Sequence, residues 1–316
     1  EIYTLSLHDA LPIFGRVWGE GYIRNGKINH HNLYATLSHY SERQLLRLSY
    51  LRGEQHSGIT WEGVSEKQMN DPVYGRRYNP AGEYFDEAGN RLYYDNETDN
   101  YFSDIVQFLF TRELTGHLSL NVNLNWNHGY GYYENYKKED PIFGKKFSYY
   151  GFENQVVDGV THKRSDLIKR ELMENDFYVA NAGAEYRKNA LKLNGGMMYA
   201  FYDGNHYGRL KWVKFNQNIP ENHEWYRNKG KKSEFSTFLK AEYQLNLLIS
   251  LYGDLQYRQI GYRFSGNDKD RAAMDGNLIY RFFNPKAGAF LRLNDRNRLY
   301  VCQRSEERRV GKECRS

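Results

Sequence analysis

The chain has 316 residues, a formal net charge of +5 and a low mean hydropathy of −0.85. Aromatic residues make up 16% of it, which argues against a disordered chain because disordered chains are poor in aromatic residues. No run of roughly 18 apolar residues occurs, so the sequence excludes a membrane-spanning helix but leaves short membrane-spanning strands open.

The two ends of the chain differ from its middle. The opening EIYTLSLHDALPIF is not a secretory signal, because Glu1 stands where a basic start is needed and polar residues interrupt the apolar run. The segment 304–316 can be encoded by DNA whose reverse complement, read in a shifted frame, encodes residues 2–13. That DNA resembles a sequencing-library adapter. We therefore expect 1–13 and 304–316 to be adapter-derived and non-native, and we take 14–303 as the protein proper.

Between these ends, alternating segments follow one another as predicted antiparallel strands. Successive side chains of a strand point to opposite faces, so alternation of apolar and polar residues is typical of strands with one wet face. Short turns, such as the one at Glu42-Arg43, join several of these segments into hairpins. The predicted strands lie at 32–41, 44–53, 101–114, 117–129, 175–187, 191–202, 234–245, 247–258, 276–283, 286–293 and 298–303.

The clearest of these strands is HLSLNVNLNWNHG at 117–129. In a membrane barrel its apolar row would face lipid and its asparagine-rich row would face a water-filled lumen. A strand of a soluble sandwich with asparagines in bulk water would show the same pattern. The predicted lipid-facing residues are Leu118, Leu120, Val122, Leu124 and Trp126, and the predicted lumen-facing residues are Ser119, Asn121, Asn123, Asn125 and Asn127.

The predicted connections alternate in length. Short turns alternate with long polar segments at about 55–100, 129–173, 203–233 and 259–275. Structureless loops of more than about 15 residues are uncommon in compact soluble domains. Short turns at one end and long loops at the other are typical of an outer-membrane barrel. Aromatic residues near the strand ends that lead into the long loops predict an interfacial girdle: Tyr50, Trp126, Tyr199, Phe201, Tyr202 and Tyr257.

Several segments resemble the barrel of TonB-dependent outer-membrane receptors of Gram-negative bacteria. They are TWEGVSEKQM, YNPAGEYFDEAGN, YYDNETDNY, KRSDLIKRELMENDFY, GNHYGRLKW and FFNPKAGAFLRLND, and together they cover nearly all of 14–303 in the expected order. The resemblance implies an all-β fold, an antiparallel transmembrane β-barrel of about 22 strands with a plugged lumen. With only about ten strands, we expect a middle fragment of such a barrel, in the form of an open curved sheet.

The resemblance also implies a function in the outer membrane, which is energy-coupled uptake of a large nutrient such as an iron–siderophore complex. The implied partners are outer-membrane lipid, a plug domain and the TonB energy-coupling complex in the intact protein, and the nutrient itself. We expect no nucleic-acid partner and no cofactor. A passive porin or a surface adhesin built on a barrel stays open as the alternative.

No catalytic constellation is found, so we predict that the chain is not an enzyme. The segment HEWYR at His223 lacks the second histidine of a zinc-binding helix. His30 and His31 are adjacent and would face opposite sides of a strand. The acidic stretch 95–100 lacks the central glycine and the final glutamate of an EF-hand loop. We therefore expect no metal site.

The predicted loops are rich in aromatic and cationic residues. Aromatic faces with nearby cations suit flat, anionic or sugar-like ligands, although the same residues would also serve packing between loops. The candidate ligand-binding residues are Trp61, Tyr132, Tyr133, Trp212, Trp225, Tyr226 and Arg227.

Overall fold

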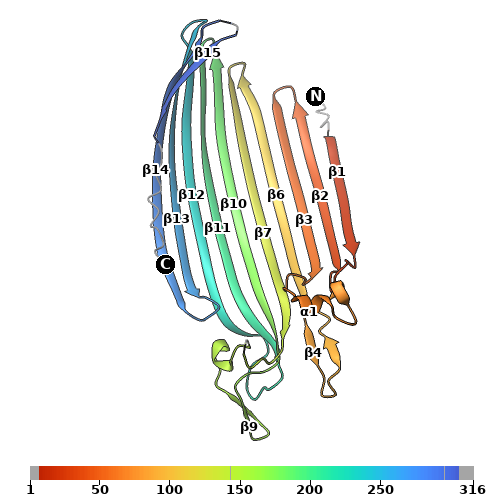
Figure 1. Ribbon diagram of the computed structural model, residues 1–316. Coiled ribbons are helices and arrows are strands. Elements are labelled where there is room, and N and C mark those ends of the chain that lie inside the picture. Colours follow the sequence, from red (N-terminus) through yellow and green to blue (C-terminus); the bar gives the residue numbers. More distant parts are fainter. Residues whose placement is uncertain (1–6, 143, 295, 306–316) are drawn as a thin grey trace, which may run out of the picture.

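In the computed structural model, which describes residues 7–142, 144–294 and 296–305, eleven strands form one antiparallel sheet (Figure 1). The strands lie side by side in sequence order, and the sheet is open because its two edge strands do not pair. This confirms the predicted fold class. The strands are β1 (Leu7–Gly19), β2 (Ile28–Ser41), β3 (Gln44–Gly58), β6 (Thr98–Thr115), β7 (Leu118–Lys137), β10 (Leu167–Lys188), β11 (Leu191–Val213), β12 (His223–Gln244), β13 (Ile249–Asn267), β14 (Ala273–Arg292) and β15 (Arg298–Arg304).

The remaining elements are small and lie in the connections. Two short hairpins and three single helical turns decorate the loops, and no helix in the described part of the chain could span a membrane. They are β4 (Glu83–Phe85) with β5 (Arg91–Tyr93), β8 (Gln155–Val157) with β9 (Val160–His162), α1 (Glu66–Met69), η1 (Gly75–Arg77) and η2 (Phe147–Tyr150).

The connections at the two ends of the sheet differ in length. Those at the short-turn end, the top of Figure 1, are 42–43, 116–117, 189–190, 245–248 and 293–297. Those at the long-loop end, the bottom of Figure 1, are 20–27, 59–97, 138–166, 214–222 and 268–272. Four of the five connections at the long-loop end are longer than any at the short-turn end, whereas 268–272 has five residues, as many as 293–297. The alternation of short and long connections is therefore present except at the loop predicted at about 259–275.

The strands run further toward the long-loop end than their hydrophobic pattern predicts. The predicted loop 129–173 shrinks to 138–166, because β7 and β10 stay paired from Tyr186↔Leu118 to Leu167↔Lys137. The other predicted loops shrink in the same way. Beyond Trp126 both faces of β7 carry polar or aromatic residues, so the alternation fades while the backbone ladder continues.

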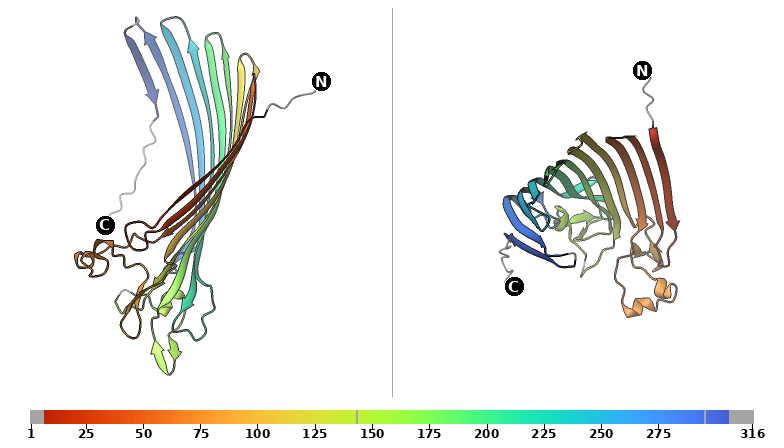
Figure 2. Two further views of the ribbon diagram at one scale, coloured as in Figure 1. Left: turned by 90° about the vertical axis from the view of Figure 1, so that its right-hand side faces the viewer. Right: turned by 90° about the horizontal axis from the view of Figure 1, so that it is seen from above.

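The sheet is strongly curved, and loop 138–166 lies inside the curve (Figure 2). Phe147 of this loop and Leu167 belong to one buried apolar cluster. Leu167 pairs with Lys137, which lies an even number of residues beyond Asn127 and so on the same face of β7. The asparagine row of β7 therefore lies on the concave face, and the row from Leu118 to Trp126 lies on the convex face. The two predicted rows thus lie on opposite faces of the curved sheet, and their contact with a lumen and with lipid stays a prediction.

On the convex face an apolar band ends at a line of large apolar and aromatic residues, which we call the girdle. In β7 the band runs from Leu118 to Trp126, roughly 26 Å of strand at about 3.3 Å per residue, close to the 25 Å of lipid that a barrel crosses. Tyr202 was expected in the girdle, but it pairs with Phe177 and faces the concave side. The girdle comprises Tyr50, Val106, Trp126, Tyr178, Phe201, Phe235, Tyr257 and Phe283.

The girdle crosses the strand register obliquely. From β3 to β11 its members are direct partners, as with Tyr178↔Phe201. From β11 to β13 it moves toward the short-turn end, since Phe235 pairs with Tyr199 and Tyr257 pairs with Thr237. Such a shift follows when strands tilt relative to the membrane plane, because a line of constant height then crosses the register rows.

An added charge should affect the free energy of folding much more on one face of β7 than on the other. Val122→Arg puts a cation in the middle of the convex band and should reduce the free energy of folding into phosphatidylcholine vesicles by about 2–4 kcal/mol. Asn123→Arg, on the concave face of the same strand, should change it far less. Denaturant titration of the chain in vesicles measures both values. Equal losses for the two variants would contradict the assignment of faces.

Candidate functional site

A cluster of apolar side chains holds the loops at the long-loop end of the concave face. Phe147 and Tyr150 of η2 contribute to it from loop 138–166, and Ile219 contributes from the connection between β11 and β12. The strands supply the other members, which are Leu167, Leu210, Val213, Trp225 and Tyr226. Burial of this cluster fixes loop 138–166 over the sheet.

A polar cavity of about 520 Å³ lies between loop 59–97, loop 138–166 and the ends of β7 and β10. Its lining mixes both charges, so it offers ion-pairing and hydrogen-bonding groups to a polar ligand. The acidic lining residues are Glu62, Glu83, Glu97, Glu139 and Asp140, and the basic ones are Lys137, Lys138, Lys145, Arg164 and Lys169.

A smaller pocket of about 170 Å³ lies beside this cavity on the concave face. Lys169 lines the larger cavity and Glu171 lines the smaller pocket, and their side chains form an ion pair with Nζ 2.6 Å from Oε1. The pair therefore lies between the two spaces. The smaller pocket also includes Tyr101, Tyr133, His206, Tyr226 and Lys269.

Glu171 is the electrostatic centre of the smaller pocket. Lys269, from the connection between β13 and β14, contacts the carboxylate oxygen that Lys169 leaves free. Burial alone would raise the pKa of Glu171, but the two ammonium groups lower it to about 2. The carboxylate is therefore charged at neutral pH and ties the connection 268–272 to β10.

Two tyrosines flank this carboxylate with neutral hydroxyl groups. Burial, together with the negative charge of Glu171, raises the pKa of Tyr133 and of Tyr226. Lys269 Nζ lies 3.4 Å from the hydroxyl oxygen of Tyr133. The ring of Trp61 meets that of Tyr133 edge-on at 6.0 Å. Aromatic rings, hydroxyl donors and charged groups thus converge at one place on the concave face.

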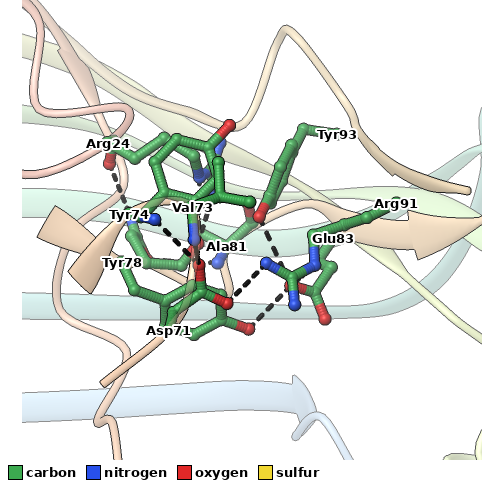
Figure 3. A network of polar contacts seen from close by, with 10 residues as sticks. Arg24, Asp71, Val73, Tyr74, Tyr78, Ala81, Glu83, Arg91 and Tyr93 are labelled. Atoms are coloured by element: carbon green, nitrogen blue, oxygen red, sulfur yellow. Dashed lines mark hydrogen bonds and ion pairs between the residues drawn. The ribbon is translucent and has the colours of Figure 1, made fainter. Parts of the chain in front are cut away.

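Loop 59–97 is ordered by its own polar network (Figure 3). Arg24 reaches in from the connection between β1 and β2, donates to the carbonyl of Asn79 at 2.8 Å, and lies 3.7 Å above the ring of Tyr93. Arg91 pairs with Asp71 at 2.6 Å. Burial and the hydrogen bond to Glu83 raise the pKa of Tyr78 to about 12. The network gives this loop a fixed shape.

Two buried carboxylates attach loop 59–97 to the sheet. Glu97 accepts hydrogen bonds from the side chain of Asn135 at 2.6 Å and from the backbone of Tyr136 at 2.7 Å. Glu134 accepts from Tyr94, Asn96 and Arg170. Because each carboxylate joins the loop to β7, one wall of the large cavity is tied directly to the barrel strands.

The structure brings together part of the predicted ligand-binding set. Trp61, Tyr133 and Tyr226 meet around the smaller pocket, and Trp225 is buried in the apolar cluster beside it. Apart from Trp61, all predicted members lie on strands rather than in loops, because the strands extend beyond their predicted ends.

The other three predicted side chains do not point into this site. Tyr132 lies along the wall of the smaller pocket. It follows Tyr133 in the ladder, so its side chain faces the convex side, where Arg170 lies 4.3 Å from its ring. Arg227 is paired with Glu224 at 2.6 Å and lies over Tyr207. Trp212 is 45% exposed and pairs with Ile168. The charged centre at Lys169, Glu171 and Lys269 was missed, since nothing in the sequence brings Lys269 to the other two residues, which lie far earlier in the chain.

Two of the histidines considered as metal ligands lie next to each other on one strand. His30 and His31 pair with Val17 and Arg16, so they face opposite sides of β2 as expected. Within the described ranges, no group of three or more histidine, cysteine, aspartate or glutamate side chains is placed to hold a metal ion.

The sheet matches the barrels of solved TonB-dependent receptors. Against the ferric-catecholate import receptor Fiu from E. coli K12, the TM-score is 0.53 at 11% identity, covering 93% of this chain and 49% of the receptor. Against the ferric preacinetobactin receptor BauA from Acinetobacter baumannii, the TM-score is 0.52 at 9% identity, covering 91% of this chain and 41% of the receptor. Against the ferric citrate transporter FecA, the TM-score is 0.56 at 7% identity, covering 92% of this chain and 38% of the transporter. The resemblance expected from the sequence is thereby confirmed in the fold.

The chain spans less than half of the length of each of these three receptors. Neither a protein-family model nor a curated protein matches the chain by sequence. The similarity therefore concerns the fold, which is that of part of a β-barrel.

The ion pairs of Glu171 predict how the connection 268–272 is held. Glu171→Gln leaves the ammonium groups of Lys169 and Lys269 without their carboxylate. Because the side chain of Lys269 is 55% exposed, its contact with Glu171 contributes up to about 1 kcal/mol. Trypsin cleavage after Lys269 should then accelerate by up to about fivefold, because the connection opens more readily from β10. Mass spectrometry of timed digests measures this rate.

Glu185→Gln is the matched control, since Glu185 pairs with Arg187 and Lys192 near the short-turn end. That variant should leave cleavage after Lys269 unchanged. An unchanged rate in Glu171→Gln would show that the carboxylate does not hold the connection.

Proposed function

We propose that the chain is part of an outer-membrane receptor that takes up a large nutrient, such as an iron–siderophore complex, with energy supplied through TonB. The observation that carries the proposal is the match of one open eleven-stranded sheet, over more than 90% of the chain, to barrels of receptors for ferric complexes. Those structural neighbours are transport receptors and not enzymes.

The concave site supports a role in ligand binding. The large cavity and the smaller pocket lie at the long-loop end, where a nutrient arriving from outside would first meet the barrel. Trp61, Tyr133 and Tyr226 present aromatic surface there, and Lys169, Glu171 and Lys269 present charge. We propose these six residues as first contacts of the nutrient.

The intact protein would need partners that work from the concave side. We propose that a plug domain fills the lumen against the asparagine row of β7, and that the TonB complex acts on that plug. Residues 1–13 and 304–316 remain proposed as adapter-derived. Strand β1 begins at Leu7 and therefore includes part of the first of these segments.

A passive porin or a barrel-based adhesin is not favoured, because the matched structures are receptors and transporters. The two classes differ in conductance. A plugged receptor should show little steady current in planar bilayers, whereas a porin should show open-channel current.

The genomic reading frame around this segment tests the proposal most simply. It should encode a plug domain before the present strands and further barrel strands after them, since eleven strands leave two open edges. Long-read sequencing of the locus shows which domains the reading frame encodes on either side of this segment. A complete gene without a plug domain would contradict the receptor assignment.

Growth of a strain that lacks the whole gene tests the nutrient class. With iron supplied only as ferric siderophores, the strain should grow poorly on at least one of them, and the plasmid-borne gene should restore growth. Normal growth on every siderophore, with impaired growth on another large nutrient, would move the proposal to that nutrient.

A further inference from the structure

A group of cations lies on the convex face of β12 to β14, just beyond the girdle. We call Lys229, Lys231, Arg263 and Arg281 the basic patch. They share the convex face with girdle residues of the same strands, since each lies an even number of residues from Phe235, Tyr257 or Phe283. The patch therefore borders the apolar band directly.

The basic patch is poorly neutralised by the protein. Asp203 pairs with both lysines, at 2.9 Å from Lys229 and 3.4 Å from Lys231. Neither arginine forms a salt bridge within the described part of the chain. Arg281 donates to Gln259, a neutral group, at 3.1 Å.

The register makes this excess of charge unfavourable for the protein alone. Lys231 lies directly opposite Arg263 in the ladder between β12 and β13. Like charges in directly opposite positions destabilise a pair of strands. The convex faces of β6 and β10 carry carboxylates at the corresponding height, where Asp104 bonds Tyr50 and Asp176 bonds Trp126. An anion from outside the chain would relieve the repulsion on β12 and β13.

The same three strands, together with the end of β15, form a mainly apolar groove further into the band. Its volume is about 620 Å³. The lining residues that share the convex face with the girdle are Leu239, Ala241, Gly253, Leu255, Pro285 and Ala287, and the polar lining residues are Asp254, Lys286, Gln303 and Ser305. A Cβ atom on Gly253 would meet no atom within 4 Å, so the groove is open there. Arg281 lies roughly 13 Å along β14 from Pro285, at about 3.3 Å per residue.

We propose that β12 to β14 bind a membrane lipid whose head group carries phosphate. The basic patch holds the phosphate, because arginine and lysine form strong charge-assisted hydrogen bonds to phosphate oxygens. The groove takes an acyl chain of the same lipid. An anion without an acyl chain would bind only to the basic patch, and a neutral lipid would bind only in the groove. The site lies on the face opposite to the nutrient site and does not depend on which nutrient is taken up.

Lipid titrations of the chain in non-ionic dodecyl maltoside micelles test this, with native mass spectrometry as the readout. Dioleoylphosphatidic acid should bind more tightly than dioleoylphosphatidylcholine or inorganic phosphate. Replacing Lys231, Arg263 and Arg281 by glutamine together should weaken phosphatidic acid binding on the order of 100-fold, because each cation near an anionic lipid contributes about fivefold.

The matched control is the triple variant Lys232→Gln, Lys240→Gln and Arg258→Gln, which removes the same charge from the concave face of β12 and β13. It should bind phosphatidic acid as the unmodified chain does. Gly253→Leu, which fills the groove, should weaken phosphatidic acid binding severalfold. If the convex triple variant does not fold, Arg281→Gln alone should weaken binding by about fivefold.

Three outcomes would overturn the proposal. They are equal binding of phosphatidic acid and phosphatidylcholine, inorganic phosphate binding as tightly as phosphatidic acid, and equal losses in the convex and concave triple variants. The second outcome would identify a site for free anions rather than for a lipid.

Discussion

The backbone of any segment that crosses lipid must find all its hydrogen-bond partners within the protein, because lipid offers none. In this chain neighbouring strands supply them. All of β10, from Leu167 to Lys188, pairs with β11 across a single irregularity near Ile168, and nearly all of it pairs with β7 as well. Once the ladder is complete, the side chains are free to differ between the two faces. The apolar convex face and the polar concave face both follow from this.

The same ladder builds the site. Past the girdle the strands no longer need an apolar face, so β7, β10, β11 and β12 continue with aromatic and charged residues on both sides. The loops then fold back over the concave face, where burial gives ion pairs such as Lys169–Glu171 more weight than they would have in water. The convex face at the same end carries the basic patch. Alternate residues of one strand therefore present different chemistry on the two faces of the sheet.

The sequence predicts the part of the fold in which hydrophobic alternation and the backbone ladder coincide. Leu118 to Asn127 fall on the expected faces, and the turn at residues 42–43 is where it was placed. Strand ends were missed because alternation fades after Trp126 while pairing continues. The site was only half predicted. Tyr133 and Tyr226 belong to it, but Tyr132 points the other way, which a loop assignment could not foresee. Glu171 meets Lys269 only through the curvature of the sheet.

The central claim is that the convex face contacts lipid and the concave face contacts water. A spin-label scan from Leu118 to Asn127 in phosphatidylcholine vesicles, with Cys302 and Cys314 replaced by serine, tests it most directly. Labels at the even-numbered positions should be accessible to oxygen, which partitions into lipid. Labels at the odd-numbered positions should be accessible to a water-soluble nickel chelate, giving a period of two along the strand. Equal accessibility at neighbouring positions, or the reverse phase, would contradict the account.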